Sequence, residues 1–192
     1  MTITKEAIIK ASLDLLNRDG IGNLTMRALA KELNIKAASL YWHIKNKQEL
    51  YDLIAEHITR DVTLPESIDH AEEALTAIAL EFRRVLLHTR DAVDIFAQSV
   101  PKTPARIKAI KFVLSALTKL GVSDKNCMTA ANLINNYILS FVADEIRAKQ
   151  LSSEELEQFE MLFGKQYAFD SDFERQFLYG LNVLLTGLLH VK

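Results

Sequence analysis

The chain has 192 residues, of which 49% are hydrophobic and 25% are charged, and its formal net charge is −2. Such a chain can bury a sizeable core in one domain or two small ones, and no segment has the polar, unpatterned composition of a disordered region. The single cysteine cannot form an intrachain disulfide, and the sequence shows neither a secretory signal nor an uninterrupted apolar run of about 20 residues that could span a membrane. We therefore expect a cytoplasmic protein without a membrane partner.

Charge differs between the two parts of the chain. Residues 1–60 contain nine Lys and Arg against seven Asp and Glu, whereas residues 61–192 contain 14 against 18. This asymmetry has the sign expected for an N-terminal part that meets a polyanion, but an excess of two cations is too small to identify nucleic acid as the partner.

The N-terminal third has the hydrophobic spacing of four short helices. Apolar residues recur at three- and four-residue steps over 5–17, 26–33, 37–44 and 47–60. Thr25 is a suitable N-cap for the second helix, and Asn34 suits a left-handed turn before the third. Asn46 with Glu49 resembles a capping box that starts the fourth. Since two short helices cannot bury enough surface alone, we interpret 25–47 as a helix-turn-helix that the first and fourth helices hold in place.

The rest of the chain also has helical spacing, so we predict an all-α fold without strands. The pattern is interrupted near 61–65. This break separates an N-terminal domain over 1–47, with a connecting helix over 47–62, from a C-terminal domain over 63–192. In the second domain, helices are expected over 66–88, 91–99, 105–120 and 124–149, with two more that begin after 152 and 171.

The last predicted helix is apolar almost all round, which is more than packing on a single core requires. Another surface must therefore cover part of it, and two glycines seven residues apart, Gly180 and Gly187, would let a neighbouring helix approach closely. We hypothesise a homodimer in which the helix over 124–149 and the last helix of each subunit form an intersubunit four-helix bundle. The residues expected in this interface are Tyr137, Phe141, Phe177, Gly180, Leu181, Leu184, Gly187 and Leu188.

A helix-turn-helix reads DNA by placing the start of its second helix in the major groove, while neighbouring side chains hold phosphates. Ala37, Ala38 and Ser39 are small enough to let that helix approach base edges. Arg27 can bind guanine bidentately or a phosphate. The remaining side chains suited to phosphates are Thr25, Tyr41, Trp42, His43, Lys45 and Lys47. The alternative is that both aromatics lie in the core and that the lysines form an ordinary solvated face.

The residues themselves narrow these alternatives. The segment LTMRALAKELNIKAASLYWHIKNKQEL strongly resembles the DNA-binding domain of the tetracycline-repressor (TetR) family, above all in its LYWH-x-KNK run. The similarity continues upstream in AIIKASLDLLNRDGIGNLT and, more faintly, downstream in LEFRRVLLHTRDA and FLYGLNVLLTGL. The resemblance implies a ligand-inducible repressor of operator DNA, a helical homodimer whose C-terminal half dimerises and binds a small-molecule inducer. Carried over by position, the DNA contacts are Thr25, Arg27, Ala37, Ala38, Ser39, Tyr41, Trp42, His43 and Lys47.

Two departures from the tetracycline repressors affect specificity. The recognition helix starts with Ala37 and Ala38, preceded by Lys36 as a further DNA contact, where those repressors carry Gln and Pro, so we expect a different operator. The histidine that ligates the drug's magnesium falls at or near Phe96, and because phenyl is not a metal ligand, we do not expect a magnesium–tetracycline inducer. We expect a more apolar inducer, in a pocket lined by Phe82, Leu86, Phe96, Val100, Ile110, Val113, Leu117 and Ile138. The alternative is that these are core residues without a cavity.

The sequence does not indicate a catalytic site or a metal site. It has no G-x-S-x-G elbow, no glycine-rich phosphate loop and no H-E-x-x-H motif. A di-iron helical bundle needs Glu-x-x-His pairs, but none of the five histidines has a carboxylate three residues before it. We therefore predict neither an enzyme nor a resident metal or cofactor. Two other functions stay open, a helical carrier of a small molecule or metal and a dimerisation module, both without DNA binding.

Overall fold

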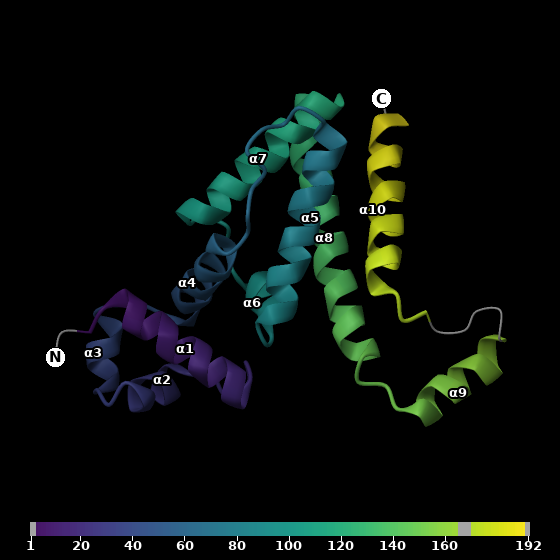
Figure 1. Cartoon of the computed structure of the whole chain (residues 1–192). Coiled ribbons are helices and arrows are strands. Elements are labelled where there is room, and N and C mark those ends of the chain that lie inside the picture. Colours follow the sequence, from purple (N-terminus) through teal and green to yellow (C-terminus); the bar gives the residue numbers. More distant parts are fainter. Residues whose placement is uncertain (1–2, 165–169, 191–192) are drawn as a thin grey trace.

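The computed structural model describes residues 3–164 and 170–190, and these residues form ten helices and no strand (Figure 1). The prediction of an all-α fold is confirmed. The helices are α1 (Lys5–Asp19), α2 (Met26–Glu32), α3 (Ala37–Tyr41), α4 (Lys47–Arg60), α5 (Ala71–His88), α6 (Ala92–Gln98), α7 (Pro104–Leu120), α8 (Asp124–Ala148), α9 (Ser153–Phe163) and α10 (Phe173–His190). Residues 1–2, 165–169 and 191–192, which belong to the predicted domain ranges 1–47 and 63–192, lie outside the described residues.

The N-terminal helices begin where the sequence supplies side-chain caps. Thr4, Thr25 and Asn46 each accept a hydrogen bond from an amide three residues later, at 3.2, 3.1 and 2.9 Å, and so satisfy an amide that the first helical turn leaves free. The capping box predicted at Asn46 is half formed, since the Glu49 carboxylate accepts from the amide of Lys45 instead, at 2.8 Å. The core that holds α1–α4 together contains the fully buried Ile8, Leu16, Leu29, Leu40, Ile44, Leu50 and Ile54.

The second helix of the predicted pair is shorter than expected. α3 ends at Tyr41 rather than at Ile44, and the amides of His43 and Ile44 both bond to the carbonyl of Leu40, at 2.9 and 3.0 Å. The chain must leave helical geometry here because Asn46 takes an extended conformation as the N-cap of α4. A tight turn therefore links α3 to α4.

Among the C-terminal helices, α5 packs against α7, α8 and α10 (Figure 1), and their buried side chains are continuous with the core of α1–α4. α8 and α10 run side by side, α6 contacts α4, and α9 projects from the core without a buried residue. α5 begins at Ala71 rather than at Glu66, because residues 66–70 instead cross the end of α7, where the Lys119 ammonium group donates to the Ile68 carbonyl at 2.8 Å. No helix in the described ranges is long and apolar enough to cross a membrane.

A buried ion pair ties three of the C-terminal helices together. The Arg83 guanidinium on α5 donates to both carboxylate oxygens of Glu145 on α8, at 2.8 Å each. The same guanidinium lies over the Phe177 ring of α10, with 5.5 Å between its carbon and the ring centroid, and Lys149 reaches the Glu145 carboxylate at 2.6 Å. Glu145 is almost completely buried and Arg83 is mostly buried, so the Arg83 charge depends on Glu145 for compensation, whereas Glu145 has Lys149 as a second partner.

Candidate nucleic-acid interface

The turn between α2 and α3 is built around an asparagine. Asn34 has a φ of 52°, in the left-handed region that asparagine tolerates. The next amide, that of Ile35, bonds to the Ala30 carbonyl at 2.9 Å and closes the end of α2. Because Leu40 and Ile44 are fully buried beneath α3, the opposite side of this helix faces solvent. The segment is thus a helix-turn-helix with one face left free.

That free face carries aromatic side chains. Trp42 is 89% exposed and Tyr41 is 50% exposed, so the alternative in which both are core aromatics is wrong. Ala38 and Ser39 are exposed beside them, and Ala37 is partly buried. We call Ala38, Ser39, Tyr41 and Trp42 the α3 face. Exposed rings of this size are typical of binding surfaces, because their apolar bodies gain from being covered while their polar tips can hydrogen-bond.

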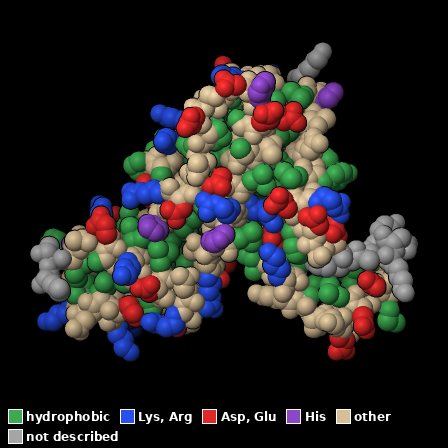
Figure 2. All heavy atoms as spheres, in the orientation of Figure 1, with side chains coloured by type: hydrophobic (Ala, Val, Ile, Leu, Met, Phe, Trp, Pro, Cys, Tyr) green, Lys and Arg blue, Asp and Glu red, His purple; other side chains and the backbone are tan. Residues whose placement is uncertain are grey.

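Cations flank the α3 face without being neutralised locally. Arg27 on α2, with Lys36 and Lys45 on either side of α3, is exposed, and no ion pair formed among the described residues includes any of the three. Lys47 is exposed as well, with its ammonium group 5.2 Å from the centre of the Tyr51 ring. Figure 2 shows Lys and Arg side chains along the lower edge of this part of the molecule. Such side chains can bind phosphate without first breaking an internal ion pair.

Two of the predicted DNA contacts, Thr25 and His43, also contribute to the structure of the helix-turn-helix itself. Thr25 caps α2 through its side-chain oxygen, so its hydroxyl proton remains available for an acceptor such as a phosphate. His43 lies partly buried in the turn between α3 and α4. Nine of the eleven predicted contacts are exposed, the exceptions being His43 and Ala37. The surface of residues 25–47 therefore presents small side chains that let α3 approach DNA bases, together with aromatic rings and cations outside ion pairs.

Seven of the eight residues predicted to line an inducer pocket lie on α5, α6, α7 and α8, and two of them, Phe82 and Phe96, pack directly on each other. Phe82 and Phe96 meet edge to face, with 4.9 Å between their ring centroids. Leu86, Leu117 and Ile138 are buried. Ile110 and Val113 are partly buried. In the described part of the chain, no group of three or more His, Cys, Asp or Glu is arranged to hold a metal ion.

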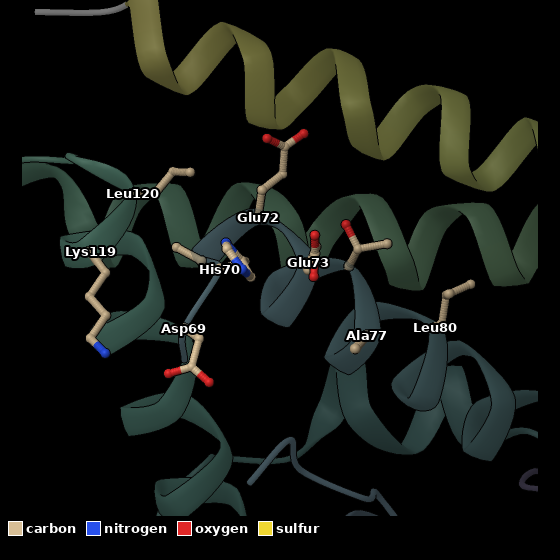
Figure 3. A pocket seen from close by; sticks show the side chains of 10 residues that line it. Asp69, His70, Glu72, Glu73, Ala77, Leu80, Lys119 and Leu120 are labelled. Carbon is tan, nitrogen blue, oxygen red and sulfur yellow. The ribbon is translucent and has the colours of Figure 1, made fainter. Parts of the chain in front are cut away.

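One of the residues predicted to line the pocket, Val100, lies at the surface. Val100 is exposed, because it lies in the loop that joins α6 to α7 and its amide is held at 2.7 Å by Asp52. Two surface hollows lie elsewhere, where the start of α5 and the segment before it approach the end of α7, and none of the predicted pocket residues lines them. Figure 3 shows the larger hollow, whose polar residues include Asp69, Glu72 and Lys119. Its charged, open lining does not suit the apolar inducer that the sequence predicts.

Several residues predicted in a dimer interface instead join α8 to α10 within one chain. Phe177 and Leu181, both predicted in the dimer interface, are buried within their own subunit. Gly180 faces Tyr137, because a Cβ at this position would lie only 2.4 Å from the Tyr137 hydroxyl oxygen. That hydroxyl donates to the Phe177 carbonyl at 2.7 Å. The close approach that Gly180 permits is therefore intramolecular.

The apolar side chains that α8 and α10 expose are different ones. Tyr179 is 73% exposed and Val183 is 56% exposed, and their four-residue spacing puts them on one side of α10. Met128 and Leu133 on α8 are exposed too. The projecting α9 adds the exposed Phe159, Met161, Leu162 and Phe163. Among the other predicted interface residues, Gly187 has open space around it, while Phe141, Leu184 and Leu188 are partly buried.

A hydrogen-bonded contact joins the end of α1 to the segment between α5 and α6. Arg90 donates to the carbonyls of Asn17 and Arg18, at 2.9 and 3.1 Å. Asp91 accepts from the amide of Ile21 at 2.7 Å. No local pattern in the sequence marks this contact, although Arg90 and Asp91 lie in the segment LEFRRVLLHTRDA that carries part of the family resemblance. It joins the segment between α5 and α6 directly to the end of α1 and the loop that precedes the helix-turn-helix.

Comparison with known families identifies the class of protein. The family model described as bacterial regulatory proteins, tetR family, matches residues 8–54, which include the helix-turn-helix. The model described as tetracyclin repressor-like, C-terminal domain, matches residues 64–191. The chain is therefore a DNA-binding transcriptional regulator of the helix-turn-helix class. It belongs to the TetR family, whose members are ligand-responsive regulators.

Individual relatives agree with this family. A helix-turn-helix-type transcriptional regulator of Saccharopolyspora erythraea is 33% identical over 144 residues, 74% of this chain but only 61% of that protein, less than two thirds of its length. The class D tetracycline repressor protein of Escherichia coli is 29% identical over 194 residues, 96% of this chain and 88% of that protein. The crystal structure of BioQ with its double-stranded DNA operator is similar with a TM-score of 0.77 and 29% identity, over 99% of this chain and 100% of that chain.

Proposed function

We propose that this chain acts as a homodimeric repressor that grips an inverted-repeat operator through the α3 face and releases it when a small, largely apolar molecule binds among α5–α8. In this assignment, residues 1–47 are the DNA-binding domain, residues 47–62 the connecting helix and residues 63–192 the ligand-binding and dimerisation domain. The observation that carries the proposal is the α3 face itself. Exposed Trp42 and Tyr41 lie between cations that no ion pair of the described residues neutralises, which is the surface that a polyanion with apolar base edges would cover.

Each part of this surface has a distinct role in the proposal. Ala38 and Ser39 approach base edges in the major groove, and the Ser39 hydroxyl can donate or accept. Arg27 reaches a guanine or a phosphate, while Lys36 and Lys45 neutralise phosphates on either side of the groove. Because the start of this helix differs from that of the tetracycline repressors, the operator is expected to differ as well. In a two-fold dimer, the two α3 helices enter successive major grooves about 34 Å apart.

The operator is found by selecting bound duplexes from a randomised DNA library with the full-length protein. The expected product is an inverted repeat whose half-sites are centred about 10 base pairs, or a multiple of this spacing, apart. The affinity of the protein for this DNA should fall steeply as the salt concentration rises, because each contact with a phosphate releases a counterion from the DNA. A library that yields no enriched motif, or binding that salt does not weaken, contradicts the proposed function and favours a carrier or a dimerisation module.

The dimer has its own support in the exposed apolar residues of α8, α9 and α10. In the single chain, Val183 and Tyr179 are exposed to water, and leaving apolar surface exposed in this way costs free energy. We propose that the exposed sides of α8 and α10, rather than Phe177 and Leu181, form the four-helix bundle with a second copy. This places Tyr179 and Val183 near residues such as Leu133 across the interface.

Replacing Val183 with glutamate is expected to raise the dimer dissociation constant on the order of tenfold or more, because each interface would bury an unpaired carboxylate. The fold of the single chain should be preserved, since Val183 is mostly exposed in it. Sedimentation equilibrium measures this constant. Ile107→Glu introduces a carboxylate at an exposed apolar position of α7 and should leave the dimer dissociation constant unaltered. A wild-type chain that is monomeric at micromolar concentration, or a Val183→Glu chain that dimerises normally, contradicts the interface.

The proposed effector site is centred on two aromatic residues. Phe82 and Phe96 supply an aromatic centre on α5 and α6, and phenyl at position 96 offers no metal ligand. An apolar molecule that bound there better in the DNA-free state would shift the protein away from operator binding. Linkage requires that operator DNA then weakens effector binding by the same factor.

A further inference from the structure

Arg106, in the first turn of α7, brings a cation to the proposed effector site. Its guanidinium carbon lies 4.9 Å from the centre of the Phe96 ring, and Phe96 meets Phe82 edge to face. The three residues belong to α7, α6 and α5, so separate helices place one charge beside two aromatic rings. The cation–π contact orients the guanidinium but does not neutralise its charge.

The guanidinium of Arg106 has few partners within the protein. Its Nη1 group donates to the Ser99 hydroxyl oxygen at 2.6 Å. A guanidinium has five N–H donors in a planar fork, and this one makes no other hydrogen bond and no ion pair within residues 3–164 and 170–190. Arg106 is partly buried, and burial lowers the pKa of its guanidinium. Because arginine remains protonated at neutral pH even then, the site keeps a positive charge.

Two carboxylates of α4 attract this charge, but each has another cation as its ion-pair partner. Asp52 pairs with the Lys102 ammonium group at 2.9 Å, and Glu56 pairs with the Arg60 guanidinium at 3.2 Å. Together with Arg106, these groups comprise two carboxylates and three cations, which leaves one positive charge. Arg106 is the cation without an ion pair, so its charge is the one available to a ligand.

The surroundings of Arg106 favour an anion with a single charge. Both Glu56 oxygens already accept from the Ala105 amide, at 2.9 and 3.2 Å, so this amide at the start of α7 is not available to a ligand. Asp52 and Glu56 would also repel an anion with several negative charges. A carboxylate suits the site because its two oxygens match the guanidinium fork.

Apolar side chains accompany this charge. Besides the two aromatic rings, Val100, which follows Ser99, and Ile107, which follows Arg106, are 47% and 39% exposed. Because Arg106 itself is only partly buried, an anion can reach it from solvent. The site thus combines one cation with aromatic and aliphatic side chains, which is complementary to a molecule with an acidic group and an apolar body.

We propose that the effector is an apolar organic acid with one negative charge, whose carboxylate binds the Arg106 guanidinium and whose apolar body lies against Phe96 and Phe82. This inference rests on the proposed function, since it names the chemical class of the effector. Arg106 is then a specificity residue, because it selects the acid over a neutral molecule of the same shape.

The test measures the binding of two dyes whose fluorescence rises in apolar sites. Anilinonaphthalene sulfonate is an aromatic anion with a single charge, and phenylnaphthylamine is nearly the same molecule without the charge. Replacing Arg106 with methionine should weaken binding of the anionic dye about tenfold, because charge-assisted hydrogen bonds are lost. Binding of the neutral dye should not change, since methionine keeps an apolar contact with Phe96. The control is Lys108→Met, which removes an exposed α7 cation outside the ion pairs and should leave both dissociation constants unchanged.

A purely structural role of Arg106 predicts different results. If Arg106 only held Phe96 and Ser99 in place, Arg106→Met would lower the melting temperature and weaken the binding of both dyes alike. We expect a melting temperature no lower than that of the wild type, because the variant loses a partly buried charge that has no ion pair. Arg106→Lys keeps the charge but not the planar fork, so its affinity for the anionic dye should lie between those of the wild type and Arg106→Met.

The acid site is overturned if the wild type does not bind the anionic dye, or if a folded Arg106→Met chain binds this dye as tightly as the wild type. If Arg106→Met does not fold, Arg106→Lys decides the question, and an affinity for the anionic dye equal to that of the wild type then overturns the site. These measurements need no DNA. A randomised library that yields no operator contradicts the proposed function, whereas dye binding that does not depend on Arg106, in a protein that binds its operator, contradicts only the acid site.

Discussion

Replacing Trp42 with alanine is expected to weaken operator binding about 100-fold while leaving the thermal stability of the protein unchanged. The side chain is 89% exposed, so its removal opens no cavity in the core. Large aromatic residues dominate many binding surfaces, and a loss of about 1.4 kcal/mol is tenfold in affinity. A dimer carries the substitution at both half-sites, so a tenfold loss of affinity at each half-site multiplies to about 100-fold. Fluorescence anisotropy of labelled operator measures the affinity.

A suitable control for Trp42→Ala is Leu151→Ala, which truncates another exposed apolar side chain in the connection between α8 and α9. It should change neither operator affinity nor stability. A Trp42→Ala protein that bound operator as tightly as the wild type would remove the α3 face from the DNA contact. A lower melting temperature would mean that the aromatic ring has an internal structural role instead.

The largest expected loss of stability follows from replacing Glu145 with methionine, which should lower the free energy of unfolding by about 3 kcal/mol. The Arg83 guanidinium would keep its place among α5, α8 and α10 but lose the carboxylate that it meets through two hydrogen bonds of 2.8 Å. Denaturant unfolding measures the loss at fixed protein concentration, since dimerisation also contributes to stability.

The double variant Arg83→Met/Glu145→Met separates a broken ion pair from a loss of packing. It removes both buried charges together, so most of the stability lost in Glu145→Met should return. The exposed pair of Asp144 and Arg147 is a matched control on the same helix, and Asp144→Asn should change stability little. A double variant no more stable than Glu145→Met would contradict the view that the uncompensated guanidinium causes the loss.

The helix-turn-helix could be predicted from the sequence because its signals are local. Thr25 caps α2 and Asn34 turns the chain within a few residues of where they stand, so composition and spacing suffice to place them. Helical spacing alone does not predict the exposure of Trp42, because it does not distinguish a core aromatic residue from one on a binding surface. The LYWH-x-KNK resemblance supplied that distinction, and the exposed position of Trp42 agrees with it.

The dimer residues and the contact of Glu56 with the start of α7 depend on tertiary structure, so local sequence patterns do not reveal them. α10 is apolar on several sides, so its period does not reveal that Phe177 faces the chain's own core while Val183 faces outward. Glu56 meets Ala105 across 49 residues of sequence, and no local pattern marks that pair. Pro104 was the available signal, since a helix that begins with proline and an unbonded threonine cap needs an acceptor from elsewhere.

The emission of Trp42 tests most directly whether the α3 face reads DNA, because Trp42 is the only tryptophan in the chain. Titration with the selected operator should change its emission, reduce its quenching by acrylamide and saturate at one duplex per dimer. Added salt should reverse both changes as the complex dissociates. An operator that binds with full affinity, yet leaves the emission and the quenching of Trp42 unaltered, would show that DNA is held by another surface.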